Sequence, residues 1–400
     1  MQSVAIIGAG PAGLIAAEIL SAAGERVTVY ERMPSVGRKL LMAGRGGLNL
    51  THSGPLNAFL SRYGEARAKL ATMIEAFGPR DLIAWCEGLG QETFIGSSGR
   101  VFPKAMKASP LLRAWLARLE AQGATIQTRA TWLGWTDDGA PRFSGAEPTH
   151  VDATLLALGG ASWPKLGSDG SWTTPLEARG VRLTPFAPSN VGFSVAWSPH
   201  FRERFAGQPL KTVAIRHDDH EVRGEAMITA YGIEGGAIYA LSTSLRSAAP
   251  TTIHVDLRPS LTHTDITDKL ARAKRGDSLS STLRKTLGLS PLAISLLHEN
   301  GAPPREPQKL AALIKAVPIR LIAARGLERA ISSAGGVSWD AVDDTLQLRA
   351  IPNTYVAGEM LDWEAPTGGY LLQACFATGV WAAKNMLKRA AGLAPPAPPC

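Results

Sequence analysis

The sequence predicts an α/β fold: a Rossmann-like dinucleotide-binding domain with an inserted antiparallel β-barrel or sheet unit and a small helical subdomain. Three observations predict it. An apolar run at residues 4–7 opens into a glycine-rich turn and a helical stretch. Two later strand-like runs, at residues 154–158 and 354–357, also end in glycine. Between them, residues 190–256 alternate strand-like runs, 191–197 among them, with polar turns, and residues 263–315 suggest short helices separated by Gly and Pro.

The composition excludes several classes of protein. Of the 400 residues 45% are hydrophobic, which is enough to form a core and excludes disorder as the main state. Cys86, Cys375 and Cys400 form no CxxC pair, so we expect no metal, no disulfide framework and no dithiol chemistry. No apolar run reaches the ~18 residues of a membrane span, and no basic leader precedes residue 4. We therefore expect a cytoplasmic protein without membrane contact, whose charge of +8 weakly favours an anionic partner.

The first thirty residues predict a phosphate cradle. The first glycine of the GxGxxG motif permits a tight turn, the second lets the backbone approach a pyrophosphate, and the third permits close helix–strand packing. The N-terminus of the following helix offers unpaired N–H groups and a positive dipole end. These positions are Gly8, Gly10, Pro11, Ala12 and Gly13.

The second strand, at residues 26–30, ends in Glu31, 23 residues beyond Gly8. An acidic side chain at this position accepts hydrogen bonds from ribose hydroxyls. An acidic rather than basic residue there also argues against the 2′-phosphate of NADP.

Three segments resemble the glutathione-reductase-like FAD superfamily: residues 31–38, 154–160 and 354–374. The resemblance implies bound, non-covalent FAD, with a second glycine-opened helix N-terminus near the flavin. The alternative is an NAD-binding Rossmann dehydrogenase in which the terminal glycine pair is only a helix cap. Besides the first cradle, the expected cofactor residues are Glu31, Arg32, Gly37, Arg38, Lys39, Gly44, Asn49, Leu50, Thr51, Ala157, Gly159, Gly160, Gly358, Glu359, Asp362, Gly368, Gly369, Tyr370 and Gln373.

More specifically, residues 37–52, 225–236 and 334–337 together with 357–373 resemble the YhiN/BaiN-like flavoproteins, the aminoacetone oxidase family. Two departures mark a divergent branch. Leu48 stands in the Gly-Gly-Leu-Asn turn where the family commonly has the cysteine of Arg-Cys-Asn, so any role of that cysteine is absent. Glu234 stands where the family commonly has serine.

The resemblance implies an FAD-dependent oxidoreductase that takes electrons from NADH or NADPH. Hydride would pass from flavin N5 to an activated C=C, such as a uracil in ribosomal RNA or a small enone. The alternatives are an oxidase of a small amine such as aminoacetone, and a flavin-binding RNA-associated protein without turnover. Only one GxGxxG has the strand–helix context, so a nicotinamide is expected to bind transiently, which predicts ping-pong kinetics.

Four side chains are candidates for proton transfer: His52, Tyr231, Glu234 and Tyr370. A loop hydrogen bond is the alternative for His52. Cys375, on the terminal helix, is expected to be a packed, buried thiol.

The expected organisation is an FAD-binding domain (1–188 and 332–392), an inserted β domain (189–258 and 316–331), a helical subdomain (259–315) and a disordered tail (393–400). Basic clusters allow contact with nucleic acid, although a solvated surface is the alternative and few aromatic residues are interleaved with them. The clusters are Arg100, Lys104 and Lys107; Arg202, Arg204, Lys211 and Arg216; and Lys269, Arg272, Lys274 and Arg275.

Overall fold

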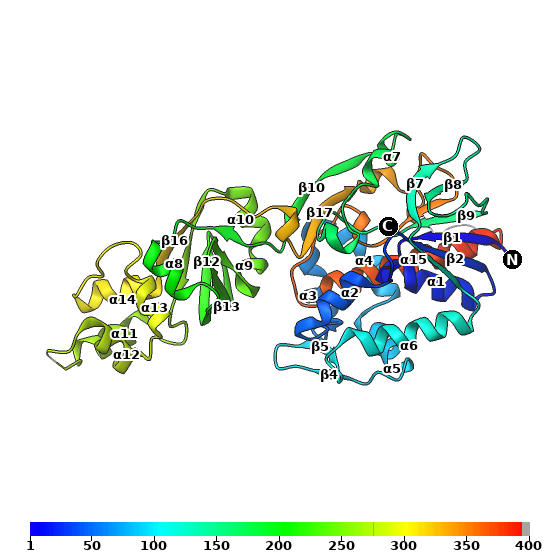
Figure 1. The fold of residues 1–400 in the computed structure, drawn as a ribbon. Coiled ribbons are helices and arrows are strands. Elements are labelled where there is room, and N and C mark those ends of the chain that lie inside the picture. Colours follow the sequence, from blue (N-terminus) through cyan, green and yellow to red (C-terminus); the bar gives the residue numbers. More distant parts are fainter. Residues whose placement is uncertain (275, 394–400) are drawn as a thin grey trace. The chain divides into compact units, whose positions relative to one another are not determined.

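The structure is a computed structural model that describes residues 1–274 and 276–393. It divides into two compact units, Met1–Ala187 with Ser332–Cys400 (unit 1) and Pro188–Ile331 (unit 2). Figure 1 shows the blue beginning and the red end of the chain within unit 1 and the green-to-yellow middle in unit 2. Arg275 and the expected disordered tail from residue 394 onward lie outside the described residues.

A five-stranded parallel sheet forms the centre of unit 1. Its carboxyl edge therefore collects the turns that follow each strand, which is where open α/β sheets bind ligands. The three glycine turns predicted from the sequence lie along this edge. In spatial order the strands are β18 (Thr354–Val356), β9 (Ala153–Leu156), β1 (Ser3–Ile7), β2 (Arg26–Glu31) and β6 (Thr125–Thr128).

The core of unit 1 is built around β1, whose five residues are all buried, as expected for a parallel strand covered on both faces. The helices α1 (Pro11–Ala22) and α15 (Tyr370–Ala390) pack against each other. A Cβ added at Gly379 would lie 2.4 Å from the carbonyl oxygen of Ala12, so a glycine within α15 allows this close approach. The first and last parts of the chain thus share one core.

Over its described residues, unit 1 also contains three smaller sheets and six further α-helices. The sheets are β3 (Thr51–His52) with β5 (Arg100–Pro103) and β4 (Thr93–Ile95), β7 (Thr131–Trp135) with β8 (Pro141–Ser144), and β10 (Leu183–Ser189) with β17 (Ser332–Val337). The helices are α2 (Arg38–Ala43), α3 (Leu56–Leu60), α4 (Arg67–Ala76), α5 (Pro79–Gly88), α6 (Ala108–Ala121) and α7 (Thr173–Glu177).

Unit 2 contains a six-stranded antiparallel sheet with its own apolar core. In spatial order its strands are β11 (Phe193–Ser194), β14 (Gly232–Glu234), β13 (His220–Thr229), β12 (Pro209–His217), β15 (Thr251–Asp256) and β16 (Val317–Leu321). Its helices are α8 (Pro199–Phe205), α9 (Gly236–Ala240), α10 (Ser242–Ala248), α11 (His263–Ala271), α12 (Leu279–Leu287), α13 (Pro291–Leu296) and α14 (Pro307–Lys315).

These observations confirm the predicted fold class, a Rossmann-like α/β domain with an inserted antiparallel unit and helices. One predicted strand is wrong in extent: of residues 191–197 only Phe193 and Ser194 are in a strand. Asn190 has a positive φ of 53°, and the indole of Trp197 donates to the carbonyl of Gly232, so the flanking residues leave the ladder.

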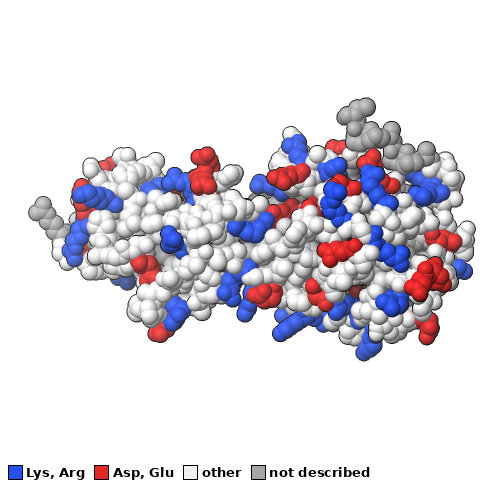
Figure 2. All heavy atoms as spheres, turned by 90° about the horizontal axis from the view of Figure 1, so that it is seen from above, with Lys and Arg blue, Asp and Glu red and all other residues white. Residues whose placement is uncertain are grey.

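The positive charge is unevenly divided between the units. Unit 2 holds 19 Lys and Arg against 13 Asp and Glu, and unit 1 holds 23 against 21, so unit 2 carries +6 of the net +8. Figure 2 nevertheless shows acidic side chains interspersed with basic ones on the face in view. Within the described ranges, no helix is both long and apolar enough to cross a membrane.

Candidate cofactor-binding site

The turn between β1 and α1 has the geometry of a phosphate cradle. Gly8 has a φ of +108°, and a Cβ there would lie 2.3 Å from the carbonyl oxygen of Ala157. A Cβ at Gly13 would lie 2.0 Å from the carbonyl oxygen of Gly8, so this glycine permits helix–strand packing. A Cβ at Gly10 would meet nothing within 4 Å. Helix α1 starts at Pro11 without a side-chain cap, so its first N–H groups suit an anion from outside the chain.

Glu31 stands at the carboxyl end of β2 beside this cradle. Its Oε2 accepts a hydrogen bond of 3.1 Å from the amide of Ala9, and its Oε1 accepts one of 2.8 Å from the amide of Met33. Burial raises the pKa of the Glu31 carboxyl, and the two amides act in the opposite direction. These contacts fix the carboxylate within the glycine loop and leave acceptor capacity for a hydroxyl.

A small, partly open pocket lies beside β2. Arg32, on its wall, forms an ion pair of 2.7 Å with Asp169. The other polar and aromatic lining residues were not predicted from the sequence, because most of them lie in loops or in β7, where no motif marks them. The lining residues are Ile7, Tyr30, Arg32, Ala130, Thr131, Trp132, Leu158, Gly167, Asp169, Ser171 and Trp172.

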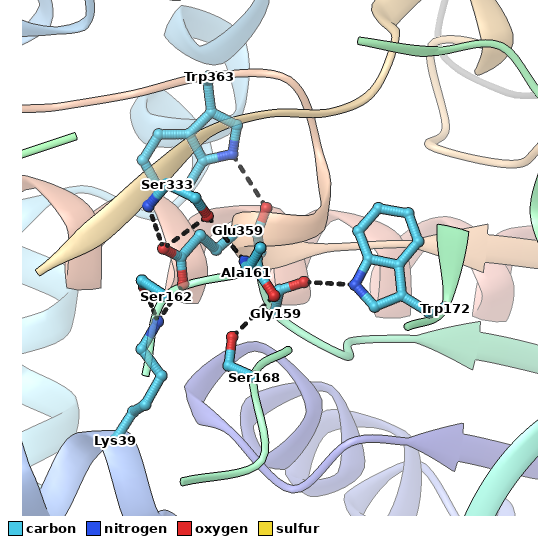
Figure 3. Close-up of polar contacts among 11 residues, drawn as sticks. Lys39, Gly159, Ala161, Ser162, Ser168, Trp172, Ser333, Glu359 and Trp363 are labelled. Carbon is cyan, nitrogen blue, oxygen red and sulfur yellow. Dashed lines mark hydrogen bonds and ion pairs between the residues drawn. The ribbon is translucent and has the colours of Figure 1, made fainter. Parts of the chain in front are cut away.

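A buried polar network joins the turns after β9 and β18 (Figure 3). Lys39 Nζ lies 2.6 Å from Glu359 Oε2 and donates to Ser162 Oγ at 3.0 Å. The other carboxylate oxygen of Glu359 accepts from the amide of Ser333 at 3.0 Å. Glu359 is 6% exposed, so Lys39 compensates a buried charge. The structure thus brings together two predicted cofactor residues that lie 320 positions apart.

The same network holds the glycine pair after β9. The hydroxyl of Ser333 accepts from the amide of Ala161 at 3.0 Å, and the indole of Trp172 donates to the carbonyl of Gly159 at 2.8 Å. A Cβ at Gly160 would lie 1.8 Å from Ser333 Oγ. Gly160 is therefore required for packing. Ser333 was missed by sequence reasoning, although the adjacent Ala-Gly-Gly-Val segment contributed to the family resemblance.

Several predicted cofactor side chains instead hold the loop at β3 to the terminal helix. Thr51 Oγ1 donates to Gln373 Oε1 at 2.8 Å, and both residues are fully buried. Asn49 Nδ2 donates to the carbonyls of Thr51 and Val101. A Cβ at Gly369 would lie 2.5 Å from Thr51 Cα, so the glycine that begins α15 touches this loop. The loop is fixed against the N-terminus of α15, and any cofactor contact here falls to its backbone.

The remaining predicted cofactor residues also lie in unit 1. Gly37, with a φ of +64°, precedes α2, and the buried Nε of Arg38 has no hydrogen-bond partner among the residues that the structure describes. Asp362 accepts from Thr184 Oγ1 at 2.6 Å. Close backbone or side-chain neighbours surround Gly44, Gly358 and Gly368, and Leu50 and Ala157 are buried.

The position of the missing family cysteine is part of the core. Leu48 is fully buried, and its amide donates to the carbonyl of Met106. An apolar side chain is therefore suited to this position.

Two predicted proton-transfer residues stack on each other in unit 1. The rings of His52 and Tyr370 are 5.7 Å apart and nearly parallel. His52 Nδ1 accepts from the amide of Gly54, so Nε2 donates to the carbonyl of Ser98; both nitrogens are used by loop hydrogen bonds. The backbone carbonyl of Tyr370 accepts from Tyr63, but its own hydroxyl has no hydrogen-bond partner in the described part of the chain.

The other two candidates, Tyr231 and Glu234, form a cluster in unit 2. The hydroxyl of Tyr231 donates to Glu234, and the guanidinium of Arg325 lies 4.8 Å from the ring centroid of Tyr231. Burial and Glu234 raise the pKa of Tyr231. A Cβ at Gly192 would lie 2.8 Å from Tyr231 Oη, so a glycine is needed beneath this pair. Arg325 was missed because its contact depends on the pairing of distant segments.

The two described cysteines are both buried and free. Burial raises the pKa of both Cys86 and Cys375 to about 12, which disfavours the reactive thiolate. Over residues 1–274 and 276–393 no cluster of His, Cys, Asp and Glu has the arrangement of a metal site.

This chain is similar to known proteins over almost its whole length. A family model described as HI0933-like protein Rossmann domain matches residues 2–385. The chain is 28% identical to a 3-dehydro-bile acid delta(4,6)-reductase of Clostridium scindens, with 97% of this chain and 100% of that protein covered. It is 23% identical to a ribosomal RNA dihydrouridine synthase of Escherichia coli, with 96% and 97% covered.

Two solved structures share the fold. One is a flavocytochrome c3 fumarate reductase, with a TM-score of 0.52, 16% identity, and coverage of 97% of this chain and 78% of that one. The other is a 3-ketosteroid delta1-dehydrogenase of Sterolibacterium denitrificans, with a TM-score of 0.52, 11% identity, and coverage of 97% and 100%. At these identities the likeness shows the fold alone.

Proposed function

Because the chain belongs to the HI0933-like protein Rossmann domain family and is a flavoprotein oxidoreductase, we propose that it reduces an activated C=C with electrons from NADH or NADPH. The observation that carries this proposal is the 28% identity, over 97% of this chain and 100% of the relative, to a protein named as a 3-dehydro-bile acid delta(4,6)-reductase. The proposed acceptor is a C=C conjugated to a carbonyl, as in an enone or in the uracil ring of ribosomal RNA.

The described residues fit FAD at the carboxyl edge of the parallel sheet. The uncapped first turn of α1 and the open space at Gly10 suit the pyrophosphate, and Glu31 suits a ribose hydroxyl. The N-terminus of α15, begun by Gly369 with no side-chain cap, supplies a second positive dipole end. When bound there, FAD would supply the two-electron redox chemistry.

Among the four predicted proton-transfer residues, we assign Tyr370 as the group that donates a proton to the reduced C=C acceptor. The ring nitrogens of His52 are both used by backbone hydrogen bonds, and the proton of Tyr231 is donated to Glu234. The phenol of Tyr370 keeps its donor capacity, and its ring is held by stacking on His52 and by a tilted contact with the ring of Phe59. A general acid held in place contributes typically about 10²- to 10⁴-fold to a rate.

Anaerobic reduction of the purified, FAD-loaded protein tests the proposal. We expect NADH or NADPH to bleach the flavin absorbance, and an enone or a uracil-containing RNA to restore it. Steady-state rates should give parallel double-reciprocal lines, because donor and acceptor are expected to use the flavin in turn. Unbleached flavin with both nicotinamides contradicts the reductase. Oxidation of aminoacetone with reduction of O2 to hydrogen peroxide, and no reoxidation by a C=C acceptor, contradicts it too.

A further inference from the structure

The outer edge of the sheet β3–β5–β4 in unit 1 is open (Figure 1). In spatial order β4 is the last strand, and no strand among residues 1–274 and 276–393 pairs with its outer side. Successive residues of a strand point to opposite faces of the sheet. Phe94 is 39% exposed and Ile95 is 60% exposed, so β4 is uncovered on both faces as well as along its edge. An exposed edge strand with apolar side chains is a template for pairing with another chain.

The hairpin of β4 and β5 is hydrogen-bonded at both ends of β4. At one end the amide of Lys104 donates to the carbonyl of Glu92 at 2.8 Å. At the other end the amide of Gly96 donates to the carbonyl of Arg100 at 2.8 Å. Hydrogen-bonded and non-hydrogen-bonded pairs alternate along an antiparallel ladder. The even-numbered positions of β4 therefore bond to β5, and the odd-numbered positions direct their N–H and C=O groups away from it.

Two residues of β4 thus present backbone groups that no other strand of the described chain uses. Phe94 lies opposite Phe102 and bonds inward, whereas Thr93 and Ile95 point outward. Two outward residues on either side of one inward residue form a pattern that matches itself. A second β4, antiparallel and centred on Phe94, places its Ile95 opposite Thr93 and its Thr93 opposite Ile95. Each opposed pair can then exchange two hydrogen bonds, in the isologous two-fold contact that is commonest among protein oligomers.

The apolar side chains of β4 are complementary in this pairing. Directly opposed residues have their side chains on the same face. The central row therefore contains Phe102 and Phe94 of one copy followed by Phe94 and Phe102 of the second copy, and within one copy these rings are already 5.7 Å apart. On the other face, Ile95 adjoins Thr93 of the second copy. Both exposed apolar side chains of β4 gain cover, and aromatic pairs across strands stabilise a sheet.

Opposite charges meet in the two outer rows of the same pairing. The second copy places its Gly96 opposite Glu92 and its Arg100 directly beyond that glycine. Because Gly96 has no side chain, the exposed guanidinium of Arg100 can extend over it toward Glu92, whose side chain is 74% exposed. A Cβ at Gly96 would lie 3.5 Å from the ring of Phe102, which places this row on the face of the phenylalanines. This charge complementarity favours a second copy of this chain over an unrelated strand as the partner of β4.

We propose that two copies of this chain form a dimer in which the outer edges of their β4 strands pair antiparallel about Phe94. The pairing joins the two three-stranded sheets into one continuous sheet. Because β4 has only three residues, the contact is small, and we expect a reversible dimer whose population rises with protein concentration. The inference goes beyond the proposed reaction and does not depend on it.

Sedimentation velocity of the FAD-loaded protein at increasing concentrations tests the pairing. The wild type should shift from the mass of one chain toward the mass of two. Ile95→Pro removes one outward N–H from each copy and keeps every hydrogen bond to β5, as proline at an outward edge position does. The loss of two hydrogen bonds should weaken the dimer roughly 5- to 150-fold. Ile95→Lys keeps the backbone donor and places a charge at the contact, so it should also weaken the dimer, and it guards against a folding defect of the proline variant.

A charge exchange tests the outer rows. Arg100→Glu should weaken the dimer, because two carboxylates then meet, and Arg100→Glu/Glu92→Arg should restore it. The matched controls are Leu133→Lys and Arg142→Glu on the β7–β8 hairpin, since Leu133 is 43% exposed, Arg142 is also exposed, and both lie outside the proposed contact. Both controls should dimerise like the wild type. The inference is overturned if the wild type keeps the mass of one chain at every concentration, if Ile95→Pro and Ile95→Lys leave the dimer intact, or if the controls dissociate it equally.

Discussion

Replacing Lys39 with methionine tests the buried ion pair that joins the turns after β9 and β18. Lys39 Nζ lies 2.6 Å from Glu359 Oε2, with the two side chains 25% and 6% exposed. Lys39→Met removes the ammonium, while the amide and the hydroxyl of Ser333 still donate to the carboxylate of Glu359. The variant keeps most of the apolar stem, so the charge is the main change.

The expected loss of unfolding free energy is about 3 kcal/mol, the lower end of the range for breaking a buried pair, because a quarter of the Lys39 side chain reaches water. At roughly 2 to 4 °C per kcal/mol this corresponds to a Tm about 6 to 12 °C lower. The double variant Lys39→Met/Glu359→Gln should recover most of the loss, since a neutral amide needs no counterion and still accepts from the amide of Ser333.

Thermal unfolding of the FAD-free protein is the assay, because bound cofactor would add its own stabilisation. Lys104→Met is the control, since Lys104 and its partner Glu92 are both largely exposed, and its Tm should match the wild type. Equal Tm values for Lys39→Met and the double variant would refute the reasoning, because the loss would then not come from an uncompensated carboxylate.

Four further predictions concern Glu31, Tyr370 and the two described cysteines. Glu31→Gln should raise the Kd for FAD about tenfold, as measured by flavin fluorescence, because the variant loses a charge-assisted hydrogen bond to the ribose. Because burial raises the pKa of Glu31, the FAD-free wild type should also lose stability as pH rises through that pKa, a slope that Glu31→Gln removes. Tyr370→Phe should keep FAD but slow reoxidation by the C=C acceptor about 10²- to 10⁴-fold in stopped flow, more than Tyr231→Phe does; equal rates would shift the proton elsewhere. Cys86 and Cys375, with pKa values raised to about 12, should resist iodoacetamide at pH 8 in the folded protein and react after unfolding, as peptide mapping can show.

The sequence predicted the features of the fold and site that depend on local geometry. The turn at Gly8 and the carboxylate of Glu31 follow from a strand–turn–helix unit only thirty residues long, so their spacing determines their position. Apolar runs likewise predicted the buried parallel strands. The strand expected at residues 191–197 was too long, because periodicity does not register the positive φ at Asn190.

Contacts between distant segments could not be predicted in the same way. The pairing of Lys39 with Glu359, the bracing of Gly160 by Ser333 and the stacking of Arg325 on Tyr231 all depend on which strands become neighbours. No local pattern encodes such a neighbour. The glycine motif therefore predicted where the cofactor site lies, whereas the fold was needed to show which of its side chains already form hydrogen bonds or ion pairs with each other.

The paired side chains change the expected chemistry of cofactor binding. Among the residues predicted to touch FAD, Lys39 and Glu359 compensate each other, and Thr51 and Gln373 share a buried hydrogen bond. Side chains that are already satisfied gain little by exchanging one partner for another. The pyrophosphate and flavin should therefore be held mainly by backbone N–H groups and by the two uncapped helix starts at α1 and α15. At the pyrophosphate and the flavin, such a site depends on glycine spacing rather than on particular polar side chains, whereas the ribose still relies on the carboxylate of Glu31. The site accommodates Leu48 in the family's cysteine position because that position lies in the core.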